Sequence, residues 1–204
     1  GQGSNFAMQI RMLPLNALAP VQAMLGAKVG ELGAHDALPT AVRLQRTWVR
    51  LMTGWCVLGT PATYVGVRAW LPDSYAASAT VASILIAGAF FPLSVVVLKV
   101  WTLSLGHPGI DVRASIVGLF VNVASSVALY PLWGMYGVVL GTTLGQVGSA
   151  LFYTWAARQV LGAAPRVFLR DVPWWQALVS LGVVIGLELW CAPLLPRGGL
   201  GLVA

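Results

Sequence analysis

The chain runs from Ala114 to Ala157 without a charged side chain, and it does the same from Ser74 to Leu98. A helix needs about 20 mostly apolar residues to cross the hydrocarbon core of a bilayer. The first stretch is therefore long enough for two crossings and the second for one. Two further charge-free stretches, Leu51 to Val67 and Val172 to Leu187, approach the same length. Together these stretches predict a helical integral membrane protein.

Composition and charge agree with a membrane protein. Hydrophobic residues make up 58% of the chain and charged residues only 9%, which is far more apolar than a soluble domain. The net charge is +6, but the basic residues are dispersed between apolar segments, so nucleic acid is not an expected partner. Cys56 and Cys191 lie in different apolar segments, which predicts neither a disulfide nor a metal site. Scattered carboxylates and histidines give no catalytic constellation, so the sequence does not favour an enzyme, and no cofactor is expected.

We predict an all-α, polytopic transmembrane helical bundle of about six helices, in a single domain covering residues 1–204. The spans are expected at about 12–27, 51–67, 74–98, 114–130, 136–157 and 173–194. Between the fourth and fifth spans, Pro131 to Gly134 supplies a turn that a continuous helix would not tolerate. The first span is the least apolar, which is typical of a cavity wall.

Basic residues are distributed unevenly among the connections, and this predicts an orientation. The second connection has one basic residue, Arg68, and the fourth, around Pro131 to Met135, has none. The first, third and fifth connections carry Lys28, Arg43, Arg46, Arg50, Lys99, Arg113, Arg158, Arg166 and Arg170. Because cytoplasmic loops hold the excess of Lys and Arg, these three face the cytoplasm and the N-terminal end lies outside.

Two segments carry local packing signals. Residues 38–50 alternate apolar side chains with arginines, which predicts either an amphipathic helix along the inner membrane surface or a solvated linker. Gly137, Gly141 and Gly145 recur at a four-residue spacing in the fifth span. Small residues at that spacing allow two helix backbones to approach closely in lipid.

A few polar side chains interrupt the apolar spans and are the candidate site residues. Lys99 lies toward the cytoplasmic end of the third span, where it either contacts an anionic substrate group or snorkels to the interface. Asn122 and Gln146 lie inside the fourth and fifth spans, where each either hydrogen-bonds a neighbouring helix or lines a polar path. Glu188, near the outer end of the sixth span, is a weaker candidate for coupling to an ion.

Three successive motifs carry a resemblance to a known family. They are Gly106-His107-Pro108-Gly109-Ile110-Asp111-Val112-Arg113, then the helix around Asn122, then Leu129-Tyr130-Pro131-Leu132-Trp133-Gly134-Met135-Tyr136-Gly137 through to Thr142. In these motifs the chain resembles the polysaccharide flippases of the MOP, or MATE-like, superfamily, including the Wzx-like translocases. Asn122, Pro131, Gly134, Gly137 and Thr142 match the family pattern, whereas His107 stands where Lys or Asn is frequent.

The resemblance implies one lobe of a two-lobed transporter in the bacterial inner membrane. The chain opens on Gly1-Gln2-Gly3-Ser4, and we expect it to be a C-terminal-lobe fragment whose partner is the missing N-terminal lobe. The implied substrate is a polyprenyl-pyrophosphate-linked sugar, flipped across the lipid bilayer by alternating access. Lys99 and Arg113 would then contact the pyrophosphate. A cation-coupled drug or metabolite exporter of the same superfamily, and a membrane enzyme of cell-envelope glycan synthesis, remain the alternatives.

Overall fold

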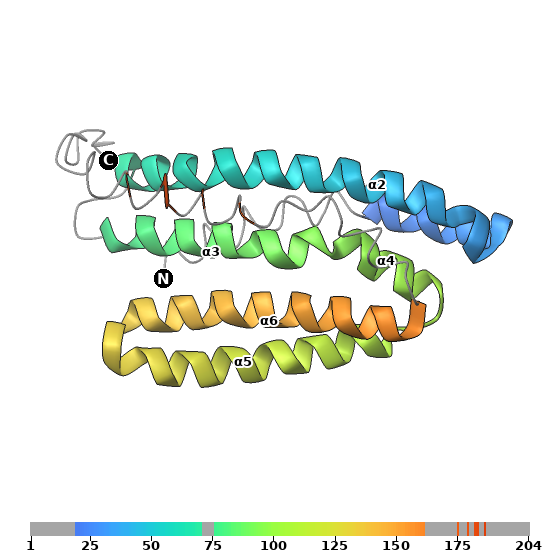
Figure 1. The fold of residues 1–204 in the computed structure, drawn as a ribbon. Coiled ribbons are helices and arrows are strands. Elements are labelled where there is room, and N and C mark those ends of the chain that lie inside the picture. The colour runs from blue at the N-terminus through green and yellow to red at the C-terminus, as the bar shows by residue number, and fades with distance from the viewer. Residues whose placement is uncertain are drawn as a thin grey trace, which may run out of the picture.

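The computed structural model describes residues 19–70 and 76–161, together with the isolated positions 175, 179, 182, 183 and 186. Every element within this part of the chain is an α-helix, which confirms the all-α prediction for the described residues. The elements are α2 (Ala19–Trp70), α3 (Ala76–Ser94), α4 (Val96–Ser104), α5 (Gly109–Trp133) and α6 (Met135–Leu161). The four longer helices lie side by side in the order α2, α3, α6, α5 (Figure 1). Helix α3 packs against both α2 and α6, whereas α5 packs mainly against α6.

Three stretches are long and apolar enough to cross a membrane, which supports a helical membrane protein. These are Ala77–Ser104, Gly109–Trp133 and Met135–Gln159, in the places predicted at 74–98, 114–130 and 136–157. The predicted span at 51–67 lies within α2 but is not among them, since Thr, Gly and Pro dilute its apolar residues. Residues 12–18 of the span predicted at 12–27 lie outside the described residues, and the rest of that span is the beginning of α2. The span predicted at 173–194 lies outside them apart from the isolated positions, so the count of six stays a prediction.

Helix α5 buries mainly small residues and exposes large apolar ones, which is the pattern expected of a helix in contact with lipid. The residues it buries are Ile110, Ala114 and Gly118, whereas Phe120 and Val127 are 72% and 70% exposed. A helix in a water-soluble protein would bury its large apolar side chains and expose small or polar ones. Exposed large apolar residues over the length of a span are favourable only where lipid or another apolar surface covers them.

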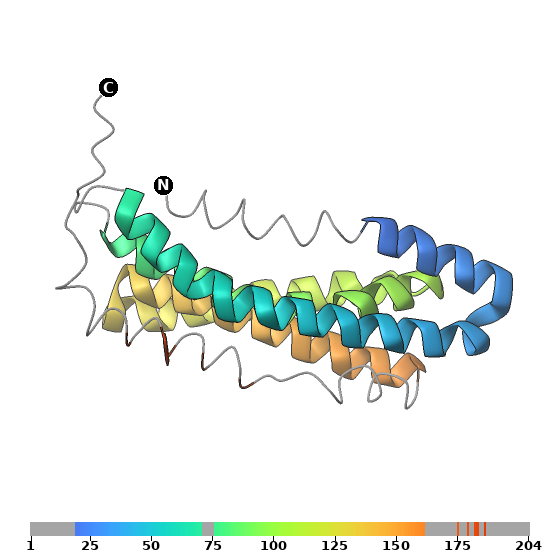
Figure 2. The same cartoon turned by 90° about the horizontal axis from the view of Figure 1, so that it is seen from above.

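The predicted amphipathic segment at 38–50 is helical but does not stand apart from the bundle. It is continuous with the rest of α2, and it buries Ala41, Val42 and Trp48 in a core cluster that includes residues of α4. Arg43 and Arg46 lie on the opposite, exposed side, so the amphipathic pattern was read correctly. The surface location is wrong for this segment, because its apolar side packs against other helices. Figures 1 and 2 show α2 folding back on itself in its blue N-terminal part. Pro39 and Pro61 lie inside this helix, and each removes a backbone donor.

The third span is a broken helix. Pro92 lies in the last turn of α3, Val95 is the turn residue, and α4 begins at Val96. Proline has no N–H to donate and crowds the preceding turn, so the helical hydrogen bonding is interrupted here. Two side chains of α2 bond carbonyls next to the break, as Gln45 Nε2 donates to Ser94 O at 2.6 Å and Trp48 Nε1 donates to Leu93 O at 2.8 Å.

Helices α5 and α6 form a closely packed hairpin, which confirms the two helices and the turn predicted between Ala114 and Ala157. Gly134 adopts a positive φ of 56°, and its N–H donates to Tyr130 O at 2.7 Å. An added Cβ at Gly145 would lie 2.7 Å from the carbonyl oxygen of Gly118. The glycines therefore bring the two backbones into contact, as their spacing predicts.

The α4–α5 turn, the end of α6 and the bend of α2 lie together at one end of the bundle, and the α5–α6 turn lies at the other (Figures 1 and 2). The described parts of the connections predicted to face the cytoplasm are thus at the same end. Lys99 and Arg113 flank the α4–α5 turn, and Arg158 lies in the last turn of α6. The orientation itself stays a prediction, since it rests on the distribution of charge.

Candidate functional site

Two cavities meet at Lys99. The first, which we call the apolar cavity, has a volume of about 350 Å³ and is lined by Val96, Lys99, Val100, Thr102, Leu103, His107, Pro108, Asp111, Val112 and Tyr153. The second, which we call the polar cavity, has a volume of about 320 Å³ and is lined by Pro92, Lys99, Ser115, Gly118, Leu119, Asn122, Thr142, Gly145, Gln146 and Ser149. Lys99 is the residue that the two linings share. It follows the helix break by one turn, so the break places Lys99 beside both spaces.

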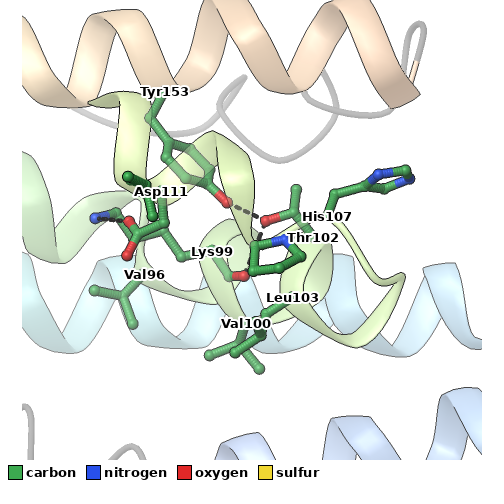
Figure 3. Close-up of a pocket in the computed structure, with 10 residues that line it drawn as sticks. Val96, Lys99, Val100, Thr102, Leu103, His107, Asp111 and Tyr153 are labelled. Carbon is green, nitrogen blue, oxygen red and sulfur yellow. Dashed lines mark hydrogen bonds and ion pairs between the residues drawn. The ribbon is translucent and has the colours of Figure 1, made fainter. Parts of the chain in front are cut away.

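In the structure, Lys99 is ion-paired. Its Nζ lies 2.6 Å from Asp111 Oδ1 and 5.2 Å from the centroid of the Tyr153 ring. Figure 3 marks the ion pair with a dashed line. The side chains of Lys99 and Asp111 are 27% and 55% exposed. An ion pair this accessible contributes about 0–1 kcal/mol. The cation–π contact adds roughly 0.5–1 kcal/mol at a site of this kind. Lys99 therefore has an anionic and an aromatic partner within the described residues.

A hydrogen-bonded pair fixes the aromatic partner of Lys99. Thr102 Oγ1 donates to the carbonyl oxygen of Lys99 at 2.9 Å, and it also shares a hydrogen bond with the hydroxyl of Tyr153. Since the threonine proton is already used, the tyrosine hydroxyl is the donor in that bond. Tyr153 is only 1% exposed, so its ring is held in place near the ammonium group of Lys99. Figure 3 shows the imidazole of His107 turned away from this network.

The α4–α5 turn explains why Asp111 reaches Lys99. Gly106 has a φ of 81°, a conformation that favours glycine, and the N–H of His107 donates to Thr102 O at 3.0 Å. This tight turn reverses the chain so that the first turn of α5, which contains Asp111, lies beside α4. A carboxylate in the first turn of a helix is also stabilised by the helix dipole and the free N–H groups there.

The polar cavity lies between the broken third span and the α5–α6 hairpin. Asn122 Oδ1 accepts a hydrogen bond from Ser126 Oγ at 3.1 Å, within α5 itself. Gln146 Oε1 is buried and has no hydrogen-bond partner among the described residues. The interhelical bonds predicted for Asn122 and Gln146 are therefore absent from the described part of the chain. Both residues instead line the polar cavity.

The structure brings together three of the four predicted site residues. Lys99, Asn122 and Gln146 line the polar cavity, whereas Arg113 is exposed on α5 and lines neither cavity described here. Their role in binding stays a prediction, and Glu188 lies outside the described residues. Sequence reasoning missed Asp111 and Tyr153. A tight turn at Gly106 would have predicted that Asp111 lies near Lys99. No local sequence feature predicts that Tyr153 lies near Lys99.

Comparison of the chain with protein-family models, with curated proteins and with solved structures found no match. Within the described residues, no group of three or more His, Cys, Asp or Glu side chains is placed to hold a metal ion.

Proposed function

We propose that this chain forms one lobe of a transporter that flips a lipid-linked oligosaccharide, carried on a polyprenyl pyrophosphate, across the bacterial inner membrane by alternating access. The observation that carries the proposal is the polar cavity. Lys99, Asn122 and Gln146, which interrupt separate apolar spans in the sequence, converge on it in space.

The cost of these polar groups supports a role in binding. A lysine at the centre of a span costs about 2.5–3.5 kcal/mol on insertion scales and less toward the end of the span, where Lys99 lies. A buried amide oxygen without a partner, like that of Gln146, costs about 1–3 kcal/mol. A pyrophosphate headgroup leaving water needs a cation and hydrogen-bond donors to replace its hydration. The Lys99 ammonium and the Asn122 amide supply donors, and the Gln146 oxygen can accept from a sugar hydroxyl.

The size and position of the cavity fit a headgroup rather than a whole oligosaccharide. At roughly 30 Å³ per water, 320 Å³ holds on the order of ten waters. A diphosphate fits in such a space, whereas the sugar chain needs the larger cavity that a second lobe would complete. The break at Pro92, which lines this cavity, is also typical of transporters, in which discontinuous helices border substrate sites.

The alternative functions find less support in the described residues. A cation-coupled exporter would need a carboxylate within a span. The described spans contain one acidic residue, Asp111, which lies in the first turn of α5 and is paired with Lys99. A glycan-synthesising enzyme would need clustered acids or catalytic histidines, and the lining of neither cavity holds such a cluster.

The test is Lys99→Gln in the intact protein in its native membrane. Loss of a charge-assisted hydrogen bond, worth about 1.5–3 kcal/mol, should lower delivery of the sugar lipid to the outer leaflet by about tenfold or more at equal protein level. Arg158→Gln is the matched control, because Arg158 is exposed at the same end of the bundle and lines neither cavity. Delivery that is unchanged in Lys99→Gln would remove the observation on which the proposal stands.

A further inference from the structure

Lys99 can serve two anions from one position. It borders the polar cavity and the apolar cavity alike, and it is now bonded to a carboxylate in the apolar one. A lysine carries its charge on a flexible stem with three donors, so small rotations redirect it without moving the backbone. The polar cavity is lined by Ser115, Asn122 and Gln146 among others, and none of the described residues in its lining is acidic.

Resting on the proposed function, we propose that Asp111 is an internal competitor for the anionic group of the substrate. Asp111 holds Lys99 while the polar cavity is vacant, and it gives Lys99 up when a pyrophosphate enters. The carboxylate thus sets the threshold for binding, because an anion that fails to displace it gains nothing from Lys99.

Asp111 is suited to release its partner. Its side chain is 55% exposed, so water solvates the carboxylate once the lysine has left. Its position in the first turn of α5 gives it a second stabilising interaction that does not depend on Lys99. A buried carboxylate without these features would hold the lysine far more firmly.

Lys99 is suited to remain between the cavities when it changes partners. The Tyr153 ring lies 5.2 Å from Nζ, and the hydrogen bond to Thr102 keeps that ring in place. The cation–π contact does not require the Asp111 carboxylate, so the ammonium keeps one attractive partner throughout the exchange.

The competitor model predicts a gain of affinity from removing a charge near the site. In the intact protein in zwitterionic detergent micelles, titration calorimetry with farnesyl pyrophosphate should show that Asp111→Asn binds up to about fivefold more tightly than the wild type, which corresponds to about 1 kcal/mol. Lys99→Gln should weaken binding, and Lys99→Gln/Asp111→Asn should lose the gain. Asp111→Ser, which keeps a polar side chain in the first helical turn, should show the same gain in affinity. It replaces Asp111→Asn in the test if that variant does not fold.

Glu31→Gln is the control for overall charge. Glu31 is exposed on α2 and lines neither cavity, so this variant should bind as the wild type does. Weaker or unchanged binding by Asp111→Asn, or an equal gain in Glu31→Gln, would overturn the competitor model while leaving the proposed function intact. Unchanged binding by Lys99→Gln would instead count against the proposed binding site itself.

Discussion

Glycine at position 141 allows α6 to lie directly against the backbone of α5. An added Cβ there would be 2.6 Å from the backbone nitrogen of Ser126 and 2.8 Å from its Cα. These are main-chain atoms, so no side-chain rotation can relieve the clash. The helices would have to separate by several tenths of an ångström before the contact reached the 3.4 Å of ordinary van der Waals contact. Overpacking of this kind costs about 1–3 kcal/mol, against a gain of up to about 1 kcal/mol from replacing a helical glycine by alanine.

We therefore expect Gly141→Ala to destabilise the protein by about 1–2 kcal/mol, or an apparent melting temperature lower by about 2–8 °C. Thermal unfolding in detergent, followed by tryptophan fluorescence, measures the shift. Gly54→Ala is the matched control, because Gly54 also lies inside a helix but has no atom within 4 Å of an added Cβ. The control should melt at or above the wild-type temperature. If Gly141→Ala melted as high as Gly54→Ala, the close α5–α6 contact would be wrong.

Two other predictions test the helix break and the orientation. Trp48→Phe removes the donor to Leu93 O beside the break. Because a buried carbonyl is then left unpaired, the free energy of unfolding should fall by about 1–3 kcal/mol, measured as a lower melting temperature. A melting temperature equal to that of the wild type would show that the break does not need this bond. In a cysteine-free background, Trp133→Cys should react with an impermeant thiol reagent from outside and His107→Cys only after the inner face is opened, since these exposed residues lie at opposite ends of the bundle. The reverse labelling pattern would overturn the orientation.

The apolar spans were predictable because hydropathy is a local property of the sequence. Long charge-free runs locate the spans that contain α3, α5 and α6 without any knowledge of their neighbours. The turn at Gly134 was predictable for the same reason, since glycine marks the position where the backbone needs a positive φ. Helix ends were less accurate, as α5 continues through Pro131 to Trp133.

The break in the third span was missed although Pro92 is visible in the sequence. Proline is tolerated in membrane helices when other groups satisfy the freed backbone. Here those groups are Gln45 and Trp48, which come from a helix more than 40 residues earlier in the chain. Nothing local predicts that pairing. The membrane-surface location predicted for residues 38–50 was wrong for a related reason, because an apolar side predicts burial but not what covers it.

The site was predictable in its parts but not in its assembly. Lys99, Asn122 and Gln146 were identified individually, since a polar residue inside an apolar span is costly. Their convergence depends on the glycine packing of α5 on α6 and on the break that begins α4, and only the first of these leaves a clear pattern in the sequence.

The ion pair between Lys99 and Asp111 has a reason to exist even before any substrate binds. An ammonium group within the third span is costly without an anionic partner, and the carboxylate of Asp111 in the next helix, α5, provides one at a distance of 2.6 Å. A partner that stabilises Lys99 in the vacant protein necessarily competes with any anion that binds the same ammonium group, because the vacant state and the bound state use the same positive charge. The same contact thus stabilises the vacant site and weakens binding to it. Removing it should therefore move stability and affinity in opposite directions, which a purely structural salt bridge would not do.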